Sequence, residues 1–186
     1  MKKMLLIRNI LVFLIFLFTA VSWAQPQVKE YVCDGEKLMF EKNQTLYRLN
    51  NKTIEEITKC NPDTKVVVFF FPLWCAPCHE HFSFLAKNID LKEYTLLITS
   101  IEKEESKRAR EFFDYFYKTN ITFPLFILSD AYLSGIAFKA KKKAGNFLAK
   151  YDPSLKDTYT NGNVAIFNNT NELIYFGSFE DYHQSK

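Results

Sequence analysis

Apolar residues along the chain follow strand-like and helix-like spacing in turn. A continuous run of β-branched and aromatic residues covers Lys65–Phe71, which is typical of a strand buried on both faces. Two further strands are predicted at Tyr94–Ile98 and Phe123–Leu128. The runs Val164–Phe167 and Leu173–Phe176 flank an Asn-rich turn and predict a hairpin.

Between these strands the apolar residues recur at steps of three and four, which predicts helices. Such spacing runs from Cys78 to Ile89, through Glu102–Lys118, where acidic residues favour the first turn, and through Leu133–Leu148. Nearer the N-terminus, Thr53–Glu56 has the form of a capping box and predicts a short helix that ends near Cys60. The order predicts an α/β sandwich with parallel core strands and an antiparallel C-terminal hairpin.

The first 24 residues differ from the rest of the chain. Lys2, Lys3 and Arg8 precede an almost wholly apolar run from Ile10 to Val21, and small residues precede a cleavage point before Gln25. This pattern is typical of a secretory signal peptide. The apolar run is shorter than the roughly 20 residues of a membrane span. An uncleaved membrane anchor is the alternative.

The chain therefore divides into three predicted parts. Residues 1–24 are the signal peptide, residues 25–52 form a strand-rich N-terminal extension, and residues 53–186 form the main domain. The extension contains three strand-like runs, at Tyr31–Val32, Leu38–Phe40 and Thr45–Leu49. We expect the protein to be exported to a periplasmic or other extracytoplasmic space.

Charge argues against a nucleic-acid partner. The whole chain has a formal net charge of +3, but three basic and no acidic residues lie in residues 1–24. In residues 25–186 the acidic and basic residues are equal in number, so this part of the chain has no general electrostatic attraction to a polyanion. We expect the basic residues within Lys139–Lys143 to form a solvated face.

The chemistry of the chain is concentrated at Cys75 and Cys78, directly after the long buried strand. The N-terminus of a helix stabilises a thiolate, so Cys75 is suited to be a nucleophile. Cys78 lies one turn further on the apolar stripe, where we expect it to be buried and to resolve a mixed disulfide. His79 is four residues from Cys75 and, if protonated, lowers the pKa of that thiol. The alternative is an exposed histidine without effect.

Two other kinds of site share this pattern of residues. Cys75–His79 matches the attachment motif of a c-type haem. However, Met39 is the only methionine after the signal peptide, and a buried strand leads straight into the motif. Cys75, Cys78, His79 and His81 could ligate a metal, but neighbouring positions on one helix do not easily converge on a tetrahedral ion. We expect no cofactor, and metal binding remains an alternative.

The run Val67–Phe71 followed by Trp74-Cys75-Ala76-Pro77-Cys78 resembles the thioredoxin superfamily. With the export signal, it is similar to the TlpA-like extracytoplasmic thiol–disulfide oxidoreductases. The resemblance covers roughly residues 55–178 and implies a thioredoxin-like three-layer sandwich. It also implies a catalytic pair, Cys75 and Cys78, modulated by Trp74, Pro77 and His79. The implied partners are disulfide-containing exported proteins and a membrane thiol electron donor.

Several positions depart from the family pattern. The stretch Thr160–Asn163 stands where the family has a cis-proline, and it contains no proline. Phe69 replaces a buried acid, His81 replaces a frequent Glu, and Ser83 replaces a helix-kinking proline. The closing helix is absent or confined to Phe179–Lys186. The missing proline, Phe69 and the long segment Lys139–Asn161 favour a second hypothesis, in which the fold serves a non-catalytic binding protein.

A second pair, Cys33 and Cys60, lies outside the motif. In an exported protein the two are expected to form a structural disulfide. The alternatives are a relay that exchanges with Cys75 and Cys78, or unpaired thiols. As a whole, the sequence predicts an exported oxidoreductase that reduces or isomerises disulfides.

Overall fold

A computed structural model describes residues 26–33, 45–119, 121, 123–133, 140–156, 158 and 161–185. The predicted signal peptide at residues 1–24 and the strand-like run at residues 38–40 lie outside the described residues. Among the described residues, no helix is both long and apolar enough to cross a membrane.

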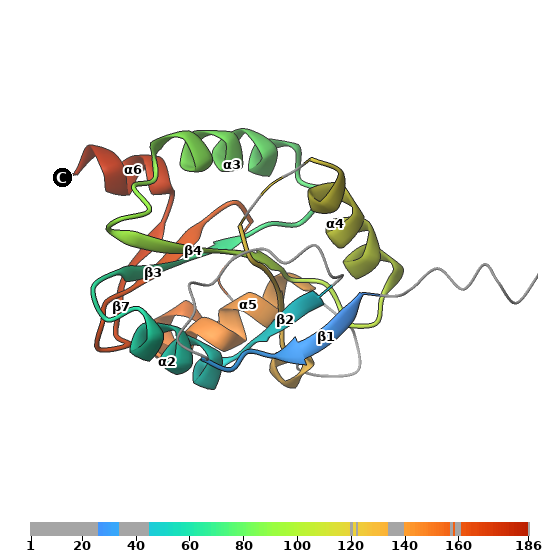
Figure 1. Cartoon of the computed structure of the whole chain (residues 1–186), viewed down its shortest axis with the longest axis horizontal. Coiled ribbons are helices and arrows are strands. Elements are labelled where there is room, and N and C mark those ends of the chain that lie inside the picture. The colour runs from blue at the N-terminus through green and yellow to red at the C-terminus, as the bar shows by residue number, and fades with distance from the viewer. Residues whose placement is uncertain are drawn as a thin grey trace, which may run out of the picture.

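One sheet of seven strands forms the centre of the described structure (Figure 1). Its strand order is β1-β2-β5-β4-β3-β6-β7. The five strands from β1 to β3 in this order are parallel to their neighbours, whereas β6 and β7 are antiparallel. The bounds are β1 Gln27–Glu30, β2 Thr45–Leu49, β3 Lys65–Phe70, β4 Tyr94–Ser100, β5 Leu125–Leu128, β6 Val164–Phe167 and β7 Leu173–Gly177. The predicted α/β class, with parallel core strands and an antiparallel C-terminal hairpin, is confirmed.

Helices cover both faces of the sheet, so the molecule has three layers (Figure 1). One face carries α3, α4 and α6, and the other carries α2 and α5. The α-helices are α2 Asn51–Cys60, α3 Ala76–Asn88, α4 Lys107–Lys118, α5 Ala140–Leu148 and α6 Phe179–Gln184. Two short 3₁₀ helices are η1 Asp130–Tyr132 and η2 Pro153–Leu155.

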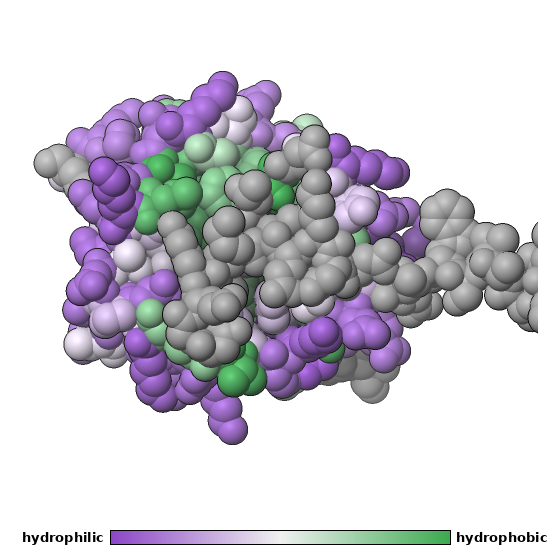
Figure 2. Space-filling model, in the orientation of Figure 1, coloured by the Kyte–Doolittle hydropathy of each residue, from purple (hydrophilic) through white to green (hydrophobic). Residues whose placement is uncertain are grey.

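Strand β3 lies between the two cores. Val67 and Phe69 point into the core beneath α3 and α4, while Val66, Val68 and Phe70 point into the core beneath α2 and α5. This alternation explains the unbroken apolar run, because each face of a central strand meets a helical layer. In the view of Figure 2, hydrophobic residues gather between α3 and the sheet, and hydrophilic residues surround the rim.

Several helix and strand starts differ from the sequence prediction. Helix α2 begins at Asn51, because the Asn50 side chain accepts the Thr53 N–H and the Thr53 hydroxyl accepts the Asn50 N–H. Helix α4 begins at Lys107 with Ser106 as its N-cap, five residues later than the acidic cluster suggested. The first strand covers residues 27–30, and residues 31–32 follow it without strand structure.

The N-terminal extension is part of the same sheet as the rest. Strand β1 pairs with β2, and β2 pairs with β5, so both lie in register with the core. Cys33, just after β1, forms a disulfide with Cys60 at the end of α2, with their Cα atoms 5.9 Å apart. The extension is therefore attached to the core by sheet hydrogen bonds and by a covalent bond.

Candidate active site

Cys75 and Cys78 form a disulfide at the junction between β3 and α3, with their Cα atoms 5.3 Å apart. Cys75 is the N-cap residue of the 13-residue helix α3, and Pro77 occupies its first turn. Proline suits this position because its missing N–H would have no helical partner there. The two cysteines are thus held by the end of a buried strand and by a helix start.

The two sulfurs have different surroundings. Cys75 is half-buried, whereas Cys78 is fully buried in the core beneath α3. The Cys75 side chain makes no capping hydrogen bond, and the helix dipole of α3 acts on whatever charge develops at Cys75. The arrangement suits a partly exposed nucleophile at Cys75 and a shielded partner at Cys78.

Gly162 brings a distant part of the chain against the buried sulfur. It lies just before β6 with a φ of 72°, the left-handed region that favours glycine. Its N–H donates to the Phe70 carbonyl, and a Cβ built on it would lie 3.2 Å from Cys78 Sγ and 2.8 Å from His81 Nδ1. The turn before β6 therefore approaches the Cys75–Cys78 disulfide closely through a glycine.

His79 is half-buried and packed, not free in solvent. Its ring lies edge-on against Phe71 and Tyr115, with centroids 4.9 and 5.4 Å away. Because a carbonyl only accepts, Nε2 carries a proton and donates to Leu73 O at 3.1 Å. Nδ1 lies 3.2 Å from the Tyr115 hydroxyl. An effect of His79 on the thiolate of Cys75 stays a prediction.

Trp74 lies immediately before Cys75 and is 43% exposed. Its indole N–H donates to Glu102 Oε1 at 3.0 Å. Glu102 follows β4 and is only 3% exposed, although the sequence predicts it in the first turn of a helix. A buried carboxylate therefore stands beside the cysteine motif.

Lys143 corrects the prediction that the basic cluster is a solvated face. Its side chain is fully buried, and Nζ donates to the Glu102 carbonyl at 2.8 Å and to Asp130 Oδ1 at 2.7 Å. Burial lowers the pKa of Lys143, and the neighbouring charges of Asp130, Glu104 and Glu102 oppose that shift. Lysine is rarely buried unless it is paired, as it is here.

A chain of ion pairs and hydrogen bonds continues from Lys143 to the N-terminal strands. Asp130 accepts the Glu104 backbone N–H at 3.3 Å, and Glu104 accepts the Asp130 backbone N–H at 3.0 Å. Arg48 on β2 binds both carboxylate oxygens of Glu104 and also pairs with Glu30 on β1. The loops after β4 and β5 are thereby joined to β1 and β2.

The described residues contain no cluster of three or more histidine, cysteine or acidic side chains placed to hold a metal. His81 lies apart from His79, with its Nδ1 3.3 Å from the Gly162 carbonyl. The four residues that the sequence grouped as candidate ligands are thus engaged in a disulfide and in separate contacts.

The second disulfide lies at the other end of β3. Cys60 ends α2 before β3 begins, and Cys75 follows the strand. Six residues at about 3.3 Å each put roughly 20 Å of strand between the two ends. This separation along the strand does not favour direct exchange between the two pairs in the folded protein, and the relay stays a prediction.

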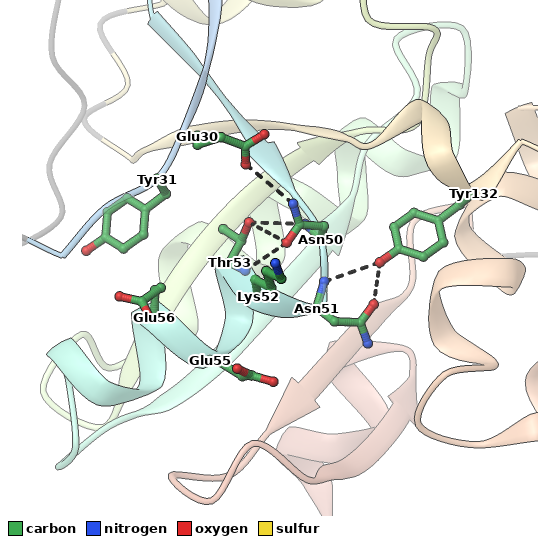
Figure 3. Close-up of a pocket in the computed structure, with 9 residues that line it drawn as sticks. All are labelled: Glu30, Tyr31, Asn50, Asn51, Lys52, Thr53, Glu55, Glu56 and Tyr132. Carbon is green, nitrogen blue, oxygen red and sulfur yellow. Dashed lines mark hydrogen bonds between the residues drawn. The ribbon is translucent and has the colours of Figure 1, made fainter.

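A cavity of about 700 Å³ lies between β1, the start of α2 and η1 (Figure 3). Residues from β1, the start of α2 and η1 line it, among them Glu30, Lys52, Glu55 and Tyr132. The Tyr132 hydroxyl donates to the Asn51 side chain at its wall. No cysteine lines this cavity, so a disulfide substrate would meet Cys75 outside it.

Comparison of the chain with protein-family models, with curated proteins and with solved structures gives no match. The site therefore rests on its own geometry. The structure brings together the two predicted cysteines and Trp74, and it adds Glu102, Lys143 and Gly162. Glu102 lies in the acidic cluster that the sequence predicted as a first helical turn, and Lys143 lies in the basic cluster that it predicted as a solvated face.

Proposed function

We propose that the protein is an exported thiol–disulfide oxidoreductase with a thioredoxin-like arrangement. The observation that carries this proposal is the Cys75–Cys78 disulfide at the start of α3, with one half-buried and one fully buried sulfur. A three-layer sandwich with the pair directly after its central strand supports the thioredoxin-like description.

The chemistry is a two-electron exchange. In the reduced protein, the Cys75 thiolate attacks one sulfur of a substrate disulfide and forms a mixed disulfide, while the second substrate sulfur leaves as a thiolate and takes a proton. Cys78 then loses its proton and attacks Cys75, which releases the first substrate thiol. The substrate gains two electrons, and the protein is left with the Cys75–Cys78 disulfide.

A reducing or isomerising direction fits the residues between the cysteines. Ala76 and Pro77 bring no charge to the motif. The substrates are disulfide-containing exported proteins, and an external thiol donor, such as a membrane thiol protein, returns the electrons. A non-catalytic binding protein on the same fold is the second candidate, favoured by the buried Phe69.

The first test is the reduction potential of the Cys75–Cys78 pair, measured by equilibration with glutathione. We expect a reversible two-electron couple near the thioredoxin value of roughly −270 mV. Cys78→Ser should trap a mixed disulfide with a protein substrate, because the resolving thiol is missing, and Cys75→Ser should form none.

The matched control is the double variant Cys33→Ser with Cys60→Ser, which should leave the potential unchanged. Absence of any reversible couple in the wild-type protein would overturn the oxidoreductase proposal and favour the binding protein. A potential near −120 mV would keep the chemistry but reverse its direction, to an oxidant of newly exported proteins.

A further inference from the structure

His79 reaches back from helix α3 to the segment that precedes the helix. Helical side chains lean toward the N-terminus of their helix, so a residue near the helix start covers the chain just before it. The Nε2 atom of His79 donates to the Leu73 carbonyl oxygen at 3.1 Å. Leu73 lies between the end of β3 and Cys75, the candidate nucleophile. A side chain of α3 therefore holds the connection that carries this cysteine.

Aromatic packing fixes the plane of the His79 ring. The ring meets Phe71 and Tyr115 edge-on, with centroids 4.9 and 5.4 Å away, and those two rings stack on each other with centroids 6.0 Å apart. Phe71 is fully buried directly after β3, and Tyr115 lies on α4. The three rings join the strand end to both helices. A ring enclosed in this way loses little further freedom when it binds Leu73.

Both ring nitrogens of His79 are engaged by groups other than a sulfur. Nε2 binds the Leu73 carbonyl, and Nδ1 lies 3.2 Å from the Tyr115 hydroxyl. A hydroxyl both donates and accepts, so Tyr115 fits Nδ1 with or without a proton on that atom. Neither nitrogen is left to donate a hydrogen bond to a Cys75 thiolate. These contacts suit a residue that positions the chain better than one that binds the thiolate.

Reduction of the disulfide removes the covalent bond that fixes Cys75. The Cys75 N–H donates to the Pro72 carbonyl at 3.1 Å, and the Cys75 carbonyl accepts the Cys78 N–H at 3.0 Å. Both of these bonds involve the backbone of Cys75 itself, whereas the bond from His79 anchors the connection two residues earlier, at Leu73. The effective concentration of one thiol at the other depends on how narrowly their geometry is held.

From these contacts we infer that His79 is a positioning residue: by anchoring the Leu73 carbonyl, it keeps the Cys75 sulfur within reach of its resolving partner after the disulfide opens. The inference rests on the proposed function and deepens it, because it assigns the rate of the resolving step and the stability of the active-site disulfide to this anchor.

The resolving step is where the anchor acts. Cys78 loses its proton and attacks the Cys75 sulfur of the mixed disulfide, the Cys75–Cys78 bond forms, and the substrate sulfur leaves as a thiolate that takes a proton. A looser connection makes the productive geometry less frequent. Without the anchor, this step is therefore slower and the Cys75–Cys78 disulfide is less stable relative to the dithiol.

A matched pair of amides tests the anchor. His79→Gln and His79→Asn both remove the imidazole and any charge on it, but only the longer Gln side chain places an N–H near the position of Nε2. The full chain is equilibrated with glutathione, and alkylation of Cys75 and Cys78 gives the reduced fraction. We expect His79→Gln to stay close to the wild-type protein. In His79→Asn the equilibrium constant for forming the disulfide should fall about 3- to 10-fold, a shift of about 14–30 mV toward a less negative potential.

The control for this pair is Tyr115→Phe, which removes the partner of Nδ1 and leaves the bond to Leu73. Its potential should stay near that of the wild-type protein. Should His79→Asn fail to fold, His79→Phe takes its place, because it keeps the ring packing and lacks the donor.

The second measurement isolates the resolving step. Reduced protein is mixed with oxidised glutathione, and the loss of glutathione from Cys75 is followed by rapid quenching and mass spectrometry. We expect this release to be about 3- to 10-fold slower in His79→Asn and near the wild-type rate in His79→Gln. Cys75 is the sulfur under attack here and not the leaving group, so a charge that stabilised its thiolate would not set this rate.

A role for His79 through positive charge gives the opposite sign. Removing a charge that stabilises the thiolate destabilises the reduced form, so both amides would shift the potential to more negative values. Such a shift, or equal potentials and equal release rates in the two amides, would overturn the inference, and a reversible couple in the wild-type protein would still support the proposed function. A wild-type protein without a reversible couple would overturn the proposed function and this inference with it.

Discussion

At the scale of single residues, Gly162 has the most restricted surroundings near the candidate active site. Its positive φ and its closeness to Cys78 and His81 act together, since a side chain would meet both an unfavourable backbone region and occupied space. The same closeness places its backbone over the buried sulfur. A methyl group added at Gly162 therefore tests how closely this turn packs against the disulfide.

We expect Gly162→Ala to lower the free energy of unfolding of the oxidised protein by about 1–3 kcal/mol, through backbone strain and the short contacts of the new methyl group. Urea denaturation followed by circular dichroism measures the change. Combining it with His81→Ala should recover only part of the loss, because the shorter side chain removes one contact and leaves the φ unchanged. A stability equal to that of the wild-type protein would contradict the close packing of this turn.

At the scale of elements, the pair of Arg48 and Glu104 joins strand β2 to the loop before α4. Burial by itself would raise the pKa of Glu104, but hydrogen bonds from Arg48 and from the Asp130 backbone, with the charges of Arg48 and Lys143, outweigh it. The pKa of Glu104 is therefore lowered from its ordinary value of 4.5. Deprotonated Glu104 is stabilised by the folded state more than by the unfolded chain.

The sign of the pH dependence follows from this direction. The contribution of Glu104 to stability is present above pH 4.5 and is lost as the pH falls through the lower folded value. We expect Glu104→Gln to be less stable than the wild-type protein at pH 7 and to approach it at pH 3. Urea unfolding across this pH range measures the difference.

The matched control for this prediction is Glu105→Gln, an exposed neighbour in the same loop. It should follow the wild-type curve. A difference between Glu104→Gln and the wild-type protein that stayed constant from pH 7 to pH 3 would contradict an electrostatic role for Glu104.

At the scale of the whole molecule, the two disulfides differ in position and in the length of chain that each one closes. Cys33–Cys60 joins residues 27 apart and connects the N-terminal strand to the far end of α2. Cys75–Cys78 joins residues three apart at the carboxyl end of the central strand. The first constrains a long segment of the unfolded chain, and the second constrains very little of it.

We expect the double variant Cys33→Ser with Cys60→Ser to lose roughly 3–4 kcal/mol of unfolding free energy by the chain-entropy model. Cys75→Ser with Cys78→Ser, the matched control, should lose much less. Thermal and urea unfolding of both double variants, alongside the wild-type protein, makes the comparison. Equal losses in the two double variants would contradict the assignment of Cys33–Cys60 as the structural bond.

Local sequence patterns predicted many of the helices and strands of the fold. The unbroken apolar run at 65–70 and the apolar stripe of α4, made by Ala109, Phe112, Phe113 and Phe116, were readable because each depends on neighbours within a few residues. The cap of α2 was misplaced by three residues, since Asn50 and Thr53 compete for the same role and only their hydrogen bonds decide it. The position of Cys75 at a helix start was likewise readable from the sequence.

By itself, the sequence determined the alternation of strands and helices, the cysteine motif at a strand–helix junction and the pairing of the C-terminal hairpin, because periodicity and turn chemistry act over short distances. Only the tertiary structure decided that Lys143 is buried, that Glu102 holds Trp74 and that Gly162 meets Cys78. These contacts join residues that are 41, 28 and 84 positions apart. The type of a charged residue does not tell whether its side chain is exposed or buried. That depends on the partners that the fold brings to it from distant parts of the chain.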